Sequence, residues 1–423
     1  MQGGDQTTRT KEEHPYDESC KTTPIGSDST GGRPTPRGGA LAIRILLWSE
    51  TFWPHIGGAE VLAARLVLAL QERHRQVIVV TAQSALDLPI NARYRGVPVY
   101  RFPFWAAAAD PNVDHVMEVR RRVATLKRAF APDLVHMHIV GPSAFFHFVT
   151  PDAHPAPLLV TLHEADPQQT YRSDTVLGQA LRRADWVTAC SASLLAEIRQ
   201  RVPEITDRSS VIYNSLDTPA VLPKPLPSSA PILLCLGRLA EEKGLDLALA
   251  AFALLRDRFP HARLVIAGDG PVRGELEQQA AELGLNEAVH FAGWIAPDEV
   301  PALINTATLV VMPSRREAFG LVALQAALMA RPVVAARVGG LPEIVAHGET
   351  GWLVEKEDSS ALAETIADLL AHYDTAVQMG RSARRRAQGL FGWERCVDAY
   401  EALYQKLTQE AAHADAEESV APK

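Results

Sequence analysis

Two short polar segments in the C-terminal half of the chain have the residue types needed to bind a phosphorylated sugar. Residues 237–244 read GRLAEEKG and contain Arg238 and Lys243, and residues 313–322 read PSRREAFGLV and contain Glu317. An arginine offers a planar fork of donors to phosphate oxygens, a lysine offers a compact positive charge, and a carboxylate accepts hydrogen bonds from hydroxyl groups. The two cations therefore predict a pyrophosphate site, and Glu317 predicts a polyol site.

Each segment stands where a strand-like apolar run gives way to a helix-like one. The two runs are residues 231–236 and 309–312, and Gly237 directly follows the first. Both segments are therefore expected at the carboxyl edge of a parallel sheet, which is where open α/β folds bind their ligands.

The second of these helices is expected to start at Phe319, Gly320 and Leu321, so that its free N–H groups point at the same ligand. A cation in the first turn of a helix is disfavoured by the helix dipole, which suggests that Arg238 and Lys243 are there to bind an anion. The alternative is a surface arginine and lysine that pair with the neighbouring glutamates of EEK.

The N-terminal half adds two adjacent glycines and several histidines near strand ends. Gly57 and Gly58 open a helix-like stretch, where backbone N–H groups favour anions, although a tight turn without a ligand would look the same. His163 directly follows a buried-type strand, and His138 ends another. A histidine at a strand end is often a structural hydrogen-bonding group, and a packed side chain is the alternative for His138.

Three carboxylates, Asp133, Glu164 and Asp166, are expected near the cleft, but no pair of them has a spacing that singles out an acid and a base. These carboxylates alone therefore assign no general acid or base.

Strand-like runs alternate with helical patterns twice over, which predicts two parallel sheets with helices on both faces. A proline-dense stretch at residues 219–231 separates the halves and is expected to be a linker. The strands are expected at residues 43–48, 76–81, 97–102, 134–138, 158–162, 186–189 and 211–213, and then at 232–236, 263–267, 289–291, 309–312, 333–335 and 352–354.

The chain has 423 residues and a formal net charge of −8, which suits a two-domain globular protein and argues against nucleic acid as a partner. Its four cysteines form no C-x-x-C pair, so neither a zinc site nor a disulfide framework is expected. No apolar run is long enough to span a membrane, and the start has no apolar signal segment. These features predict a cytoplasmic protein.

The segments quoted above resemble the motifs of retaining GT-B glycosyltransferases of family 4. The family motif R-x4-K-G is present as RLAEEKG, and E-x7-E is present as EAFGLVALQ, in which Gln325 replaces the closing glutamate. The resemblance covers residues 43 to about 407. It implies an α/β GT-B fold in which two doubly wound, Rossmann-like domains face each other across a cleft, with a C-terminal helix that crosses back to the first domain.

We accordingly expect a disordered N-terminal extension at residues 1–40, an N-terminal acceptor domain at 41–217 completed by the returning helix at 393–408, a C-terminal nucleotide-sugar domain at 218–392, and a flexible tail at 409–423. The resemblance also implies roles for single residues. His163 would hydrogen-bond the donor sugar, the Gly57-Gly58 loop would lie under the donor phosphates, and Gln325 would accept from the ribose, with a loss on the order of 1 kcal/mol against a carboxylate.

The resemblance implies a retaining glycosyltransferase that needs no metal and no cofactor. The donor would be a nucleotide sugar, with a UDP-sugar favoured over GDP-mannose, and the acceptor a hydroxyl of a glycan, a lipid-linked glycan or a small metabolite. Two alternatives remain: a nucleotide-sugar epimerase of the same fold, and a non-catalytic binding partner of an active transferase, which Gln325 motivates.

A helical stretch between Val116 and Phe130 combines an apolar stripe with arginines and lysines at positions 120–122, 127 and 128. The favoured interpretation is a helix packed on the core with a solvated basic face. The alternative is peripheral contact with anionic lipid at the inner membrane face, because relatives that act on lipid acceptors use a basic helix here.

Overall fold

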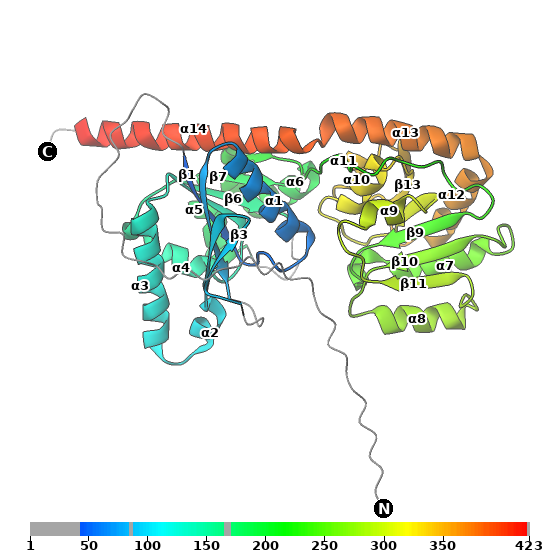
Figure 1. Ribbon diagram of the computed structural model, residues 1–423, viewed down its shortest axis with the longest axis horizontal. Helices are drawn as coiled ribbons and strands as arrows, with labels where there is room; N and C mark the ends of the chain where they lie inside the picture. The colour runs from blue at the N-terminus through cyan, green and yellow to red at the C-terminus, as the bar shows by residue number, and fades with distance from the viewer. Residues whose placement is uncertain (1–42, 84–87, 165–170, 421–423) are drawn as a thin grey trace, which may run out of the picture.

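The computed structural model describes residues 43–83, 88–164 and 171–420. Within these residues the chain forms two α/β domains that lie side by side, one built on an eight-stranded sheet and the other on a six-stranded sheet (Figure 1). This is the two-domain parallel-sheet architecture expected from the sequence. The N-terminal extension predicted at residues 1–40 lies outside the described residues.

The first sheet has the strand order β3-β4-β2-β1-β5-β6-β7-β8, and its neighbouring strands are parallel except for the antiparallel pair β3 and β4. The order reverses at β1 and β5, which makes their carboxyl ends the crevice of the sheet. The strands are β1 (Arg44–Ser49), β2 (Gln76–Ala82), β3 (Asn91–Tyr94), β4 (Val97–Phe102), β5 (Leu134–Ile139), β6 (Leu158–Leu162), β7 (Trp186–Ala189) and β8 (Ser209–Val211).

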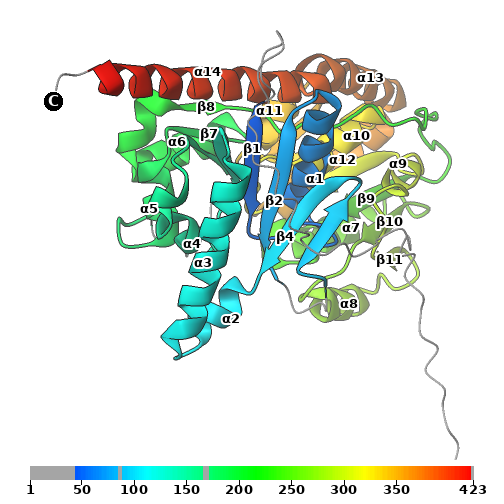
Figure 2. The ribbon, with the colours of Figure 1, turned by 60° about the vertical axis from the view of Figure 1, so that its left-hand side comes forward.

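Six α-helices belong to this domain, and α3 with the short α2 forms its outer end, as Figure 2 shows from the side. The α-helices among the described residues are α1 (Gly58–Glu72), α2 (Phe104–Ala109), α3 (Val113–Phe130), α4 (Ala144–Phe148), α5 (Val176–Arg183) and α6 (Ala192–Arg201). Two short 3-10 segments, η1 (Pro151–Ala153) and η2 (Pro203–Arg208), lie between them and after them.

The second sheet has the order β11-β10-β9-β12-β13-β14, and it reverses between β9 and β12. Its strands are β9 (Ile232–Leu236), β10 (Arg263–Ala267), β11 (Val289–Gly293), β12 (Leu309–Met312), β13 (Val333–Ala336) and β14 (Gly351–Val354). The helices are η3 (Glu241–Lys243), α7 (Leu245–Leu255), α8 (Arg273–Glu282), α9 (Val300–Ile304), α10 (Leu321–Leu328), α11 (Leu341–Ile344) and α12 (Ser359–Ala371).

Most strands are continuous apolar runs because helices cover both faces of each sheet. The edge strand β3 was missed in the sequence because its residues, NARY, are mostly polar and only partly buried. The last strand of the first sheet was expected at residues 211–213, but it pairs with β7 through Ser209, Ser210 and Val211. The start of this strand was missed because Ser209 and Ser210 are polar and do not extend the apolar run.

Two long helices, α13 (Tyr373–Leu390) and α14 (Trp393–Val420), follow one another along the same edge of both domains (Figure 1). Helix α13 packs on the second domain, and α14 crosses back to the first, where Tyr400, Tyr404 and Leu407 join the core cluster that contains β1 and α1. The returning helix is longer than expected. The segment after residue 408, predicted to be a flexible tail, continues as helix to Val420.

Candidate functional site

The two polar segments of the second domain meet at the reversal point of its sheet. A Cβ atom on Gly244, which has a positive φ of 61°, would lie 2.2 Å from the carbonyl oxygen of Pro313, so only glycine allows the loop after β9 to approach the end of β12 this closely. The carbonyl of Glu242 accepts a hydrogen bond from the backbone N–H of Arg315 at 2.8 Å. Segments distant in the sequence thus form one surface.

Lys243 and Glu317 form an ion pair at the centre of this surface. The Lys243 Nζ donates to Glu317 Oε2 at 2.7 Å, and the two side chains are 27% and 14% exposed. The sequence assigned them to neighbouring parts of one ligand, a phosphate and a sugar, and the structure brings them into direct contact. A ligand that carries a negative group next to hydroxyl groups would satisfy both partners.

Arg238 lies at the rim of the surface, and its side chain is 67% exposed. Its guanidinium pairs with Glu242, which is the surface pairing that the sequence left open as an alternative. Gly237, before it, has a φ of 138° and open space where a side chain would be. A solvent-exposed ion pair contributes only about 0–1 kcal/mol, so the guanidinium can exchange Glu242 for phosphate oxygens at little cost.

The loop that carries Glu317 is held by its neighbours in the second domain. The backbone N–H of Gly340 donates to the Glu317 carbonyl at 3.0 Å, and a Cβ on Gly339 would lie 1.7 Å from the same oxygen. Phe319 is buried, and Gly320, with a φ of 109°, precedes the first residue of α10. Helix α10 thus begins at Leu321, two residues later than expected, and the free N–H groups of its first turn lie close to Glu317.

The two glycines of the first domain lie at the start of α1, with Gly57 at its N-cap and Gly58 as its first residue. A Cβ on Gly58 would lie 3.0 Å from Leu321, so this loop faces the start of α10 across the domain boundary. The Glu60 carboxylate folds back toward Gly57 and accepts from the Thr51 hydroxyl at 2.7 Å. The first turn of α1 thus already carries a negative group. The main contribution of the two glycines is to let this loop come close to the start of α10.

Three histidines of the first domain, His136, His138 and His163, form a row, in which His136 and His138 are buried and His163 is half-buried with both ring nitrogens covered. The His138 and His163 ring centroids are 4.4 Å apart, and no group among the described residues meets full hydrogen-bond geometry with their nitrogens, although the Asn214 side chain lies beside His163. Burial lowers the pKa of His163 to about 4, although the Asn214 side chain opposes the shift, and it holds the pKa of His138 well below its usual range. Both rings are therefore neutral near pH 7.

His136 has a different role from its two neighbours. One ring nitrogen lies 2.8 Å from the Tyr404 hydroxyl of α14, and the other lies 2.7 Å from Thr161. Its hydrogen-bonding capacity is therefore used inside the core. Unpartnered nitrogens are found only on the two rings that we had singled out, His138 and His163, among the three histidines of this row.

Gln325 lies one helical turn into α10 and is half-buried. Within the described residues its side-chain amide makes no hydrogen bond, so its two polar ends are free for a ligand. An amide offers one neutral acceptor oxygen where a carboxylate offers two charged ones. The Gln325 side chain is therefore free to contact a ribose, but the hydrogen bonds that it can accept are weaker than those of a carboxylate.

Several sequence expectations outside this surface were wrong. Asp133 lies at the amino end of β5, where it pairs with Arg44 at 2.9 Å, so it is at the opposite edge of the sheet from the site. Lys127 does not belong to the basic face of α3; it is buried, and its Nζ donates to the carbonyls of His147 and Thr150. Two further expectations are not tested: Glu164 is exposed, which is compatible with a place near the cleft, and Asp166 lies outside the described residues.

The sequence also missed two residues that connect the two domains beside the site. Ser191 donates to the carbonyl of Ala318, next to Glu317, at 2.6 Å. Glu343 accepts from the backbone N–H groups of Ala192 and Ser193. A serine directly after β7 and before α6 is a recognisable helix N-cap, but its second contact depends on the packing of the two domains.

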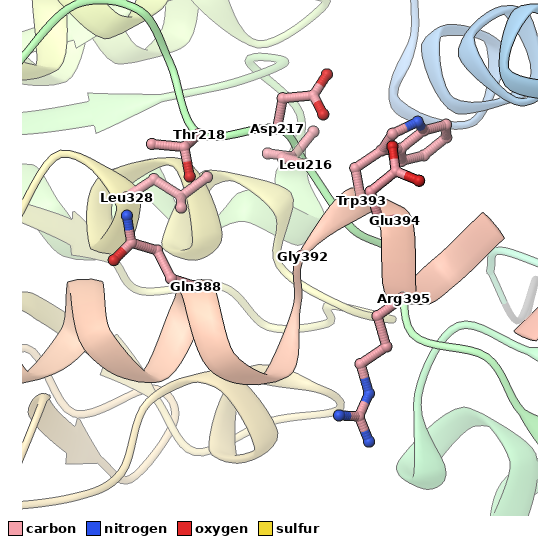
Figure 3. A pocket seen from close by; sticks show the side chains of 9 residues that line it. All are labelled: Leu216, Asp217, Thr218, Leu328, Gln388, Gly392, Trp393, Glu394 and Arg395. Carbon is pink, nitrogen blue, oxygen red and sulfur yellow. The ribbon is translucent and has the colours of Figure 1, made fainter. Parts of the chain in front are cut away.

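A separate cavity of about 380 Å³ lies where the chain crosses between the domains (Figure 3). Leu216, Asp217 and Thr218 line it from the first crossing, and Gly392 and Trp393 line it from the second. It contains none of the residues assigned to the ligand. The described residues also hold no cluster of three His, Cys, Asp or Glu side chains that could bind a metal ion, and no described helix is long and apolar enough to cross a membrane.

Comparisons with known proteins agree with this architecture. Residues 222–386 match the family model described as glycosyl transferases group 1, and residues 56–219 match the model described as glycosyltransferase family 4. The chain is 27% identical to N-acetyl-alpha-D-glucosaminyl L-malate synthase of Bacillus anthracis, over 84% of this chain and 95% of that protein. It is 32% identical to a glycogen synthase of Mycobacterium tuberculosis, over 66% and 69%.

Solved structures show the same fold. A sucrose-phosphate synthase from Thermosynechococcus elongatus superimposes with a TM-score of 0.72 at 24% identity, over 87% of this chain and all of the other. Anabaena HepE, in complex with UDP and glucose, superimposes with a TM-score of 0.68 at 23% identity, over 88% and 99%. Both matches span both domains.

Proposed function

Since this chain belongs to the group 1 glycosyltransferases of family 4 and acts on nucleotide sugars, we propose that it transfers the sugar with retention of its anomeric configuration and without a metal ion. The Lys243–Glu317 pair, at the reversal point of the second sheet, carries this proposal. It offers a positive charge for a diphosphate and, 2.7 Å away, an acceptor for sugar hydroxyls.

Charge develops on the pyrophosphate as the bond between the sugar and the phosphate breaks. Lys243, together with Arg238 after it leaves Glu242, would stabilise that charge in the transition state more than in the ground state, which is what accelerates the reaction. Fixed cations can supply this stabilisation in place of a bound metal ion. The metal-independent mechanism is supported by this pair of cations.

The histidine row bears on retention. A general base works best when its pKa lies near the operating pH, and burial lowers the pKa of His163 to about 4. His163 is therefore suited to hydrogen-bonding a sugar hydroxyl rather than to removing the acceptor proton. This supports a mechanism in which the leaving phosphate takes that proton on the same face of the sugar, which retains the configuration.

We propose a UDP-sugar as the donor, with GDP-mannose as the next candidate. The support is that Anabaena HepE, which has the same fold, binds UDP and glucose. The acceptor would be a hydroxyl group presented by the first domain. The similar proteins act on unlike acceptors, as the names L-malate synthase and glycogen synthase show, so the acceptor class stays broad.

A thermal-shift panel with UDP, GDP and ADP and their sugars tests the donor, because a ligand that binds only the folded state raises the melting temperature. The strongest ligand is then incubated with the protein alone and with simple sugars and alcohols. Release of nucleotide, with a product of unchanged anomeric configuration by NMR, is the expected result. Epimerised donor without release, or no turnover of any donor that binds, would contradict the proposal.

We further propose peripheral contact with anionic lipid through the α3 region. The Val119 and Val123 side chains of α3 pack into the core, while Trp105 of α2 and Val113 and Met117 of α3 are exposed. Sedimentation with phosphatidylglycerol vesicles, but not with phosphatidylcholine vesicles, is expected. Equal recovery with both vesicles would remove the proposal.

A further inference from the structure

Two residues with no place in the expected site connect the first domain to the loop that carries Glu317. Ser191, fully buried, follows β7 and donates its hydroxyl to the carbonyl of Ala318 in the second domain at 2.6 Å. Glu343, in α11, reaches the other way: its two carboxylate oxygens accept from the N–H groups of Ala192 and Ser193 at 2.8 and 2.9 Å.

Both contacts end at the start of α6, where the first domain offers free N–H groups. Ser191 is the N-cap of that helix and also accepts from the N–H of Leu194 at 3.1 Å. The Glu343 carboxylate satisfies two further donors of the same turn, in the position where a negative charge is favoured by the helix dipole. One helix end thus receives a cap from each domain.

On the second-domain side, both contacts lead to Glu317 within one or two residues. The carbonyl of Ala318 is held by Ser191, and the carbonyl of Glu317 is held by Gly340, which precedes α11 and Glu343. The backbone of the Glu317 loop is therefore fixed from both sides. The hydrogen bond from Ser191 crosses the domain boundary directly. The one from Gly340 stays within the second domain, but Gly340 lies next to the helix whose Glu343 crosses that boundary.

An aromatic cluster lies along the same boundary. Tyr213 of the first domain, Phe319 of the Glu317 loop and Phe391 of the second crossing have ring centroids 5.3 to 6.3 Å apart. Burial and the Glu343 carboxylate raise the pKa of Tyr213, which places Glu343 beside this cluster. The loop is thus packed as well as hydrogen-bonded against the first domain.

We propose that Ser191 and Glu343 are positioning residues, which set the Glu317 carboxylate against the donor sugar only when the first domain is seated on the second. The proposal rests on the function proposed above, in which Glu317 binds the donor sugar. It follows that sugar recognition in the second domain depends on contacts with α6 of the first. Nucleotide binding at Arg238 and Gln325 does not depend on these contacts.

The test compares Glu343→Gln, which keeps the shape of the side chain and removes its charge, with Ser191→Ala, which removes the donor to Ala318. Asn112→Ala is the matched control, because Asn112 is also a helix N-cap, of α3 at the outer end of the first domain, and accepts from the backbone N–H of Asp114 at 3.0 Å. Each protein is assayed for hydrolysis of UDP-glucose, or of GDP-mannose if the panel selects it, and for binding of the free nucleotide.

In Glu343→Gln kcat is expected to fall about tenfold, the effect of losing a charge-assisted hydrogen bond, and in Ser191→Ala about fivefold, the effect of losing a neutral one of about 1 kcal/mol. The affinity of both variants for the free nucleotide is expected to stay within about twofold of the wild type. Hydrogen exchange of the amides of residues 314–320 is expected to speed up in both. The control should match the wild type in kcat and in the exchange of this loop, although its melting temperature falls with the lost cap.

Unchanged kcat and unchanged exchange of the loop in both test variants would overturn the positioning role. A parallel loss of nucleotide affinity and kcat would also overturn it, because it would show general damage to the second domain. A wild-type protein that binds nucleotide sugars but neither hydrolyses them nor transfers their sugar to any acceptor would contradict the proposed function instead. The exchange measurement would still decide whether the first domain orders the loop.

Discussion

Replacing Glu317 with glutamine is the sharpest test of the site, because it changes one charge at the centre of the ligand surface and almost no volume. The carboxylate is 14% exposed and accepts from Lys243 at 2.7 Å. In the variant Lys243 loses its partner, and the donor sugar loses a charged hydrogen-bond acceptor. Such bonds contribute about 1.5–3 kcal/mol, so kcat/KM is expected to fall roughly 10- to 150-fold.

The effect on folding should be much smaller than the effect on turnover. A partly exposed ion pair contributes roughly 1 kcal/mol, which corresponds to a shift in melting temperature of about 2–4 °C for a domain of this size. The assay is steady-state hydrolysis or transfer with the donor selected by the thermal-shift panel. Circular dichroism at the assay temperature confirms that the variant is folded.

Glu242→Gln is the matched control, because it also removes an acidic partner of a cation, Arg238, in the same surface. Its turnover should be no lower than that of the wild type, since it frees Arg238 for phosphate oxygens. If Glu317→Gln keeps kcat/KM within threefold of the wild type, or if Glu242→Gln is equally impaired, the assignment of Glu317 to the donor sugar is refuted.

The remaining predictions concern charge and pH. Arg238→Ala and Lys243→Ala should each lower turnover by orders of magnitude, and EDTA should leave the wild-type rate unchanged; a rate restored only by a divalent ion would contradict the proposed mechanism. Gln325→Glu should tighten nucleotide binding about fivefold by calorimetry, with little change in kcat, and equal or weaker binding would show that position 325 does not face the ribose. The pKa of His163 is near 6.5 in the unfolded chain and about 4 in the folded chain. The free energy of unfolding should therefore fall as the pH falls through that interval, by roughly 3 kcal/mol from this residue. A melting temperature that stays constant from pH 7 to pH 4.5 would contradict its burial.

The sequence was informative wherever local pattern and chemistry coincide. Arg238, Lys243 and Glu317 follow apolar strands, and the carboxyl ends of parallel strands meet at one edge, so their approach was predictable without knowing the packing of the domains. The positive φ of Gly244 against Pro313 explains why the two loops can touch. The family resemblance added the role of His163 toward the donor sugar and the crossing helix.

The errors arose where long-range packing decides. Lys127 has the spacing of a surface residue on α3, yet two carbonyls at the end of α4 take its ammonium group into the interior. The pairing of Asp133 with Arg44 depends on the register between β5 and β1. The roles of Ser191 and Glu343 depend on how two separately folded sheets face each other, which periodicity within one segment does not encode.

The returning helix α14 has a consequence for how the protein is made. The core of the first domain contains Tyr404, whose hydroxyl lies 2.8 Å from His136, a residue 268 positions earlier in the chain. At a synthesis rate of about 5–20 residues per second, the second member of this pair emerges on the order of ten to fifty seconds after the first. During that interval the nascent first domain exposes the surface of β1 and α1 that α14 later covers. Its completion therefore waits until α14 has been synthesised, when the second domain is already available to fold.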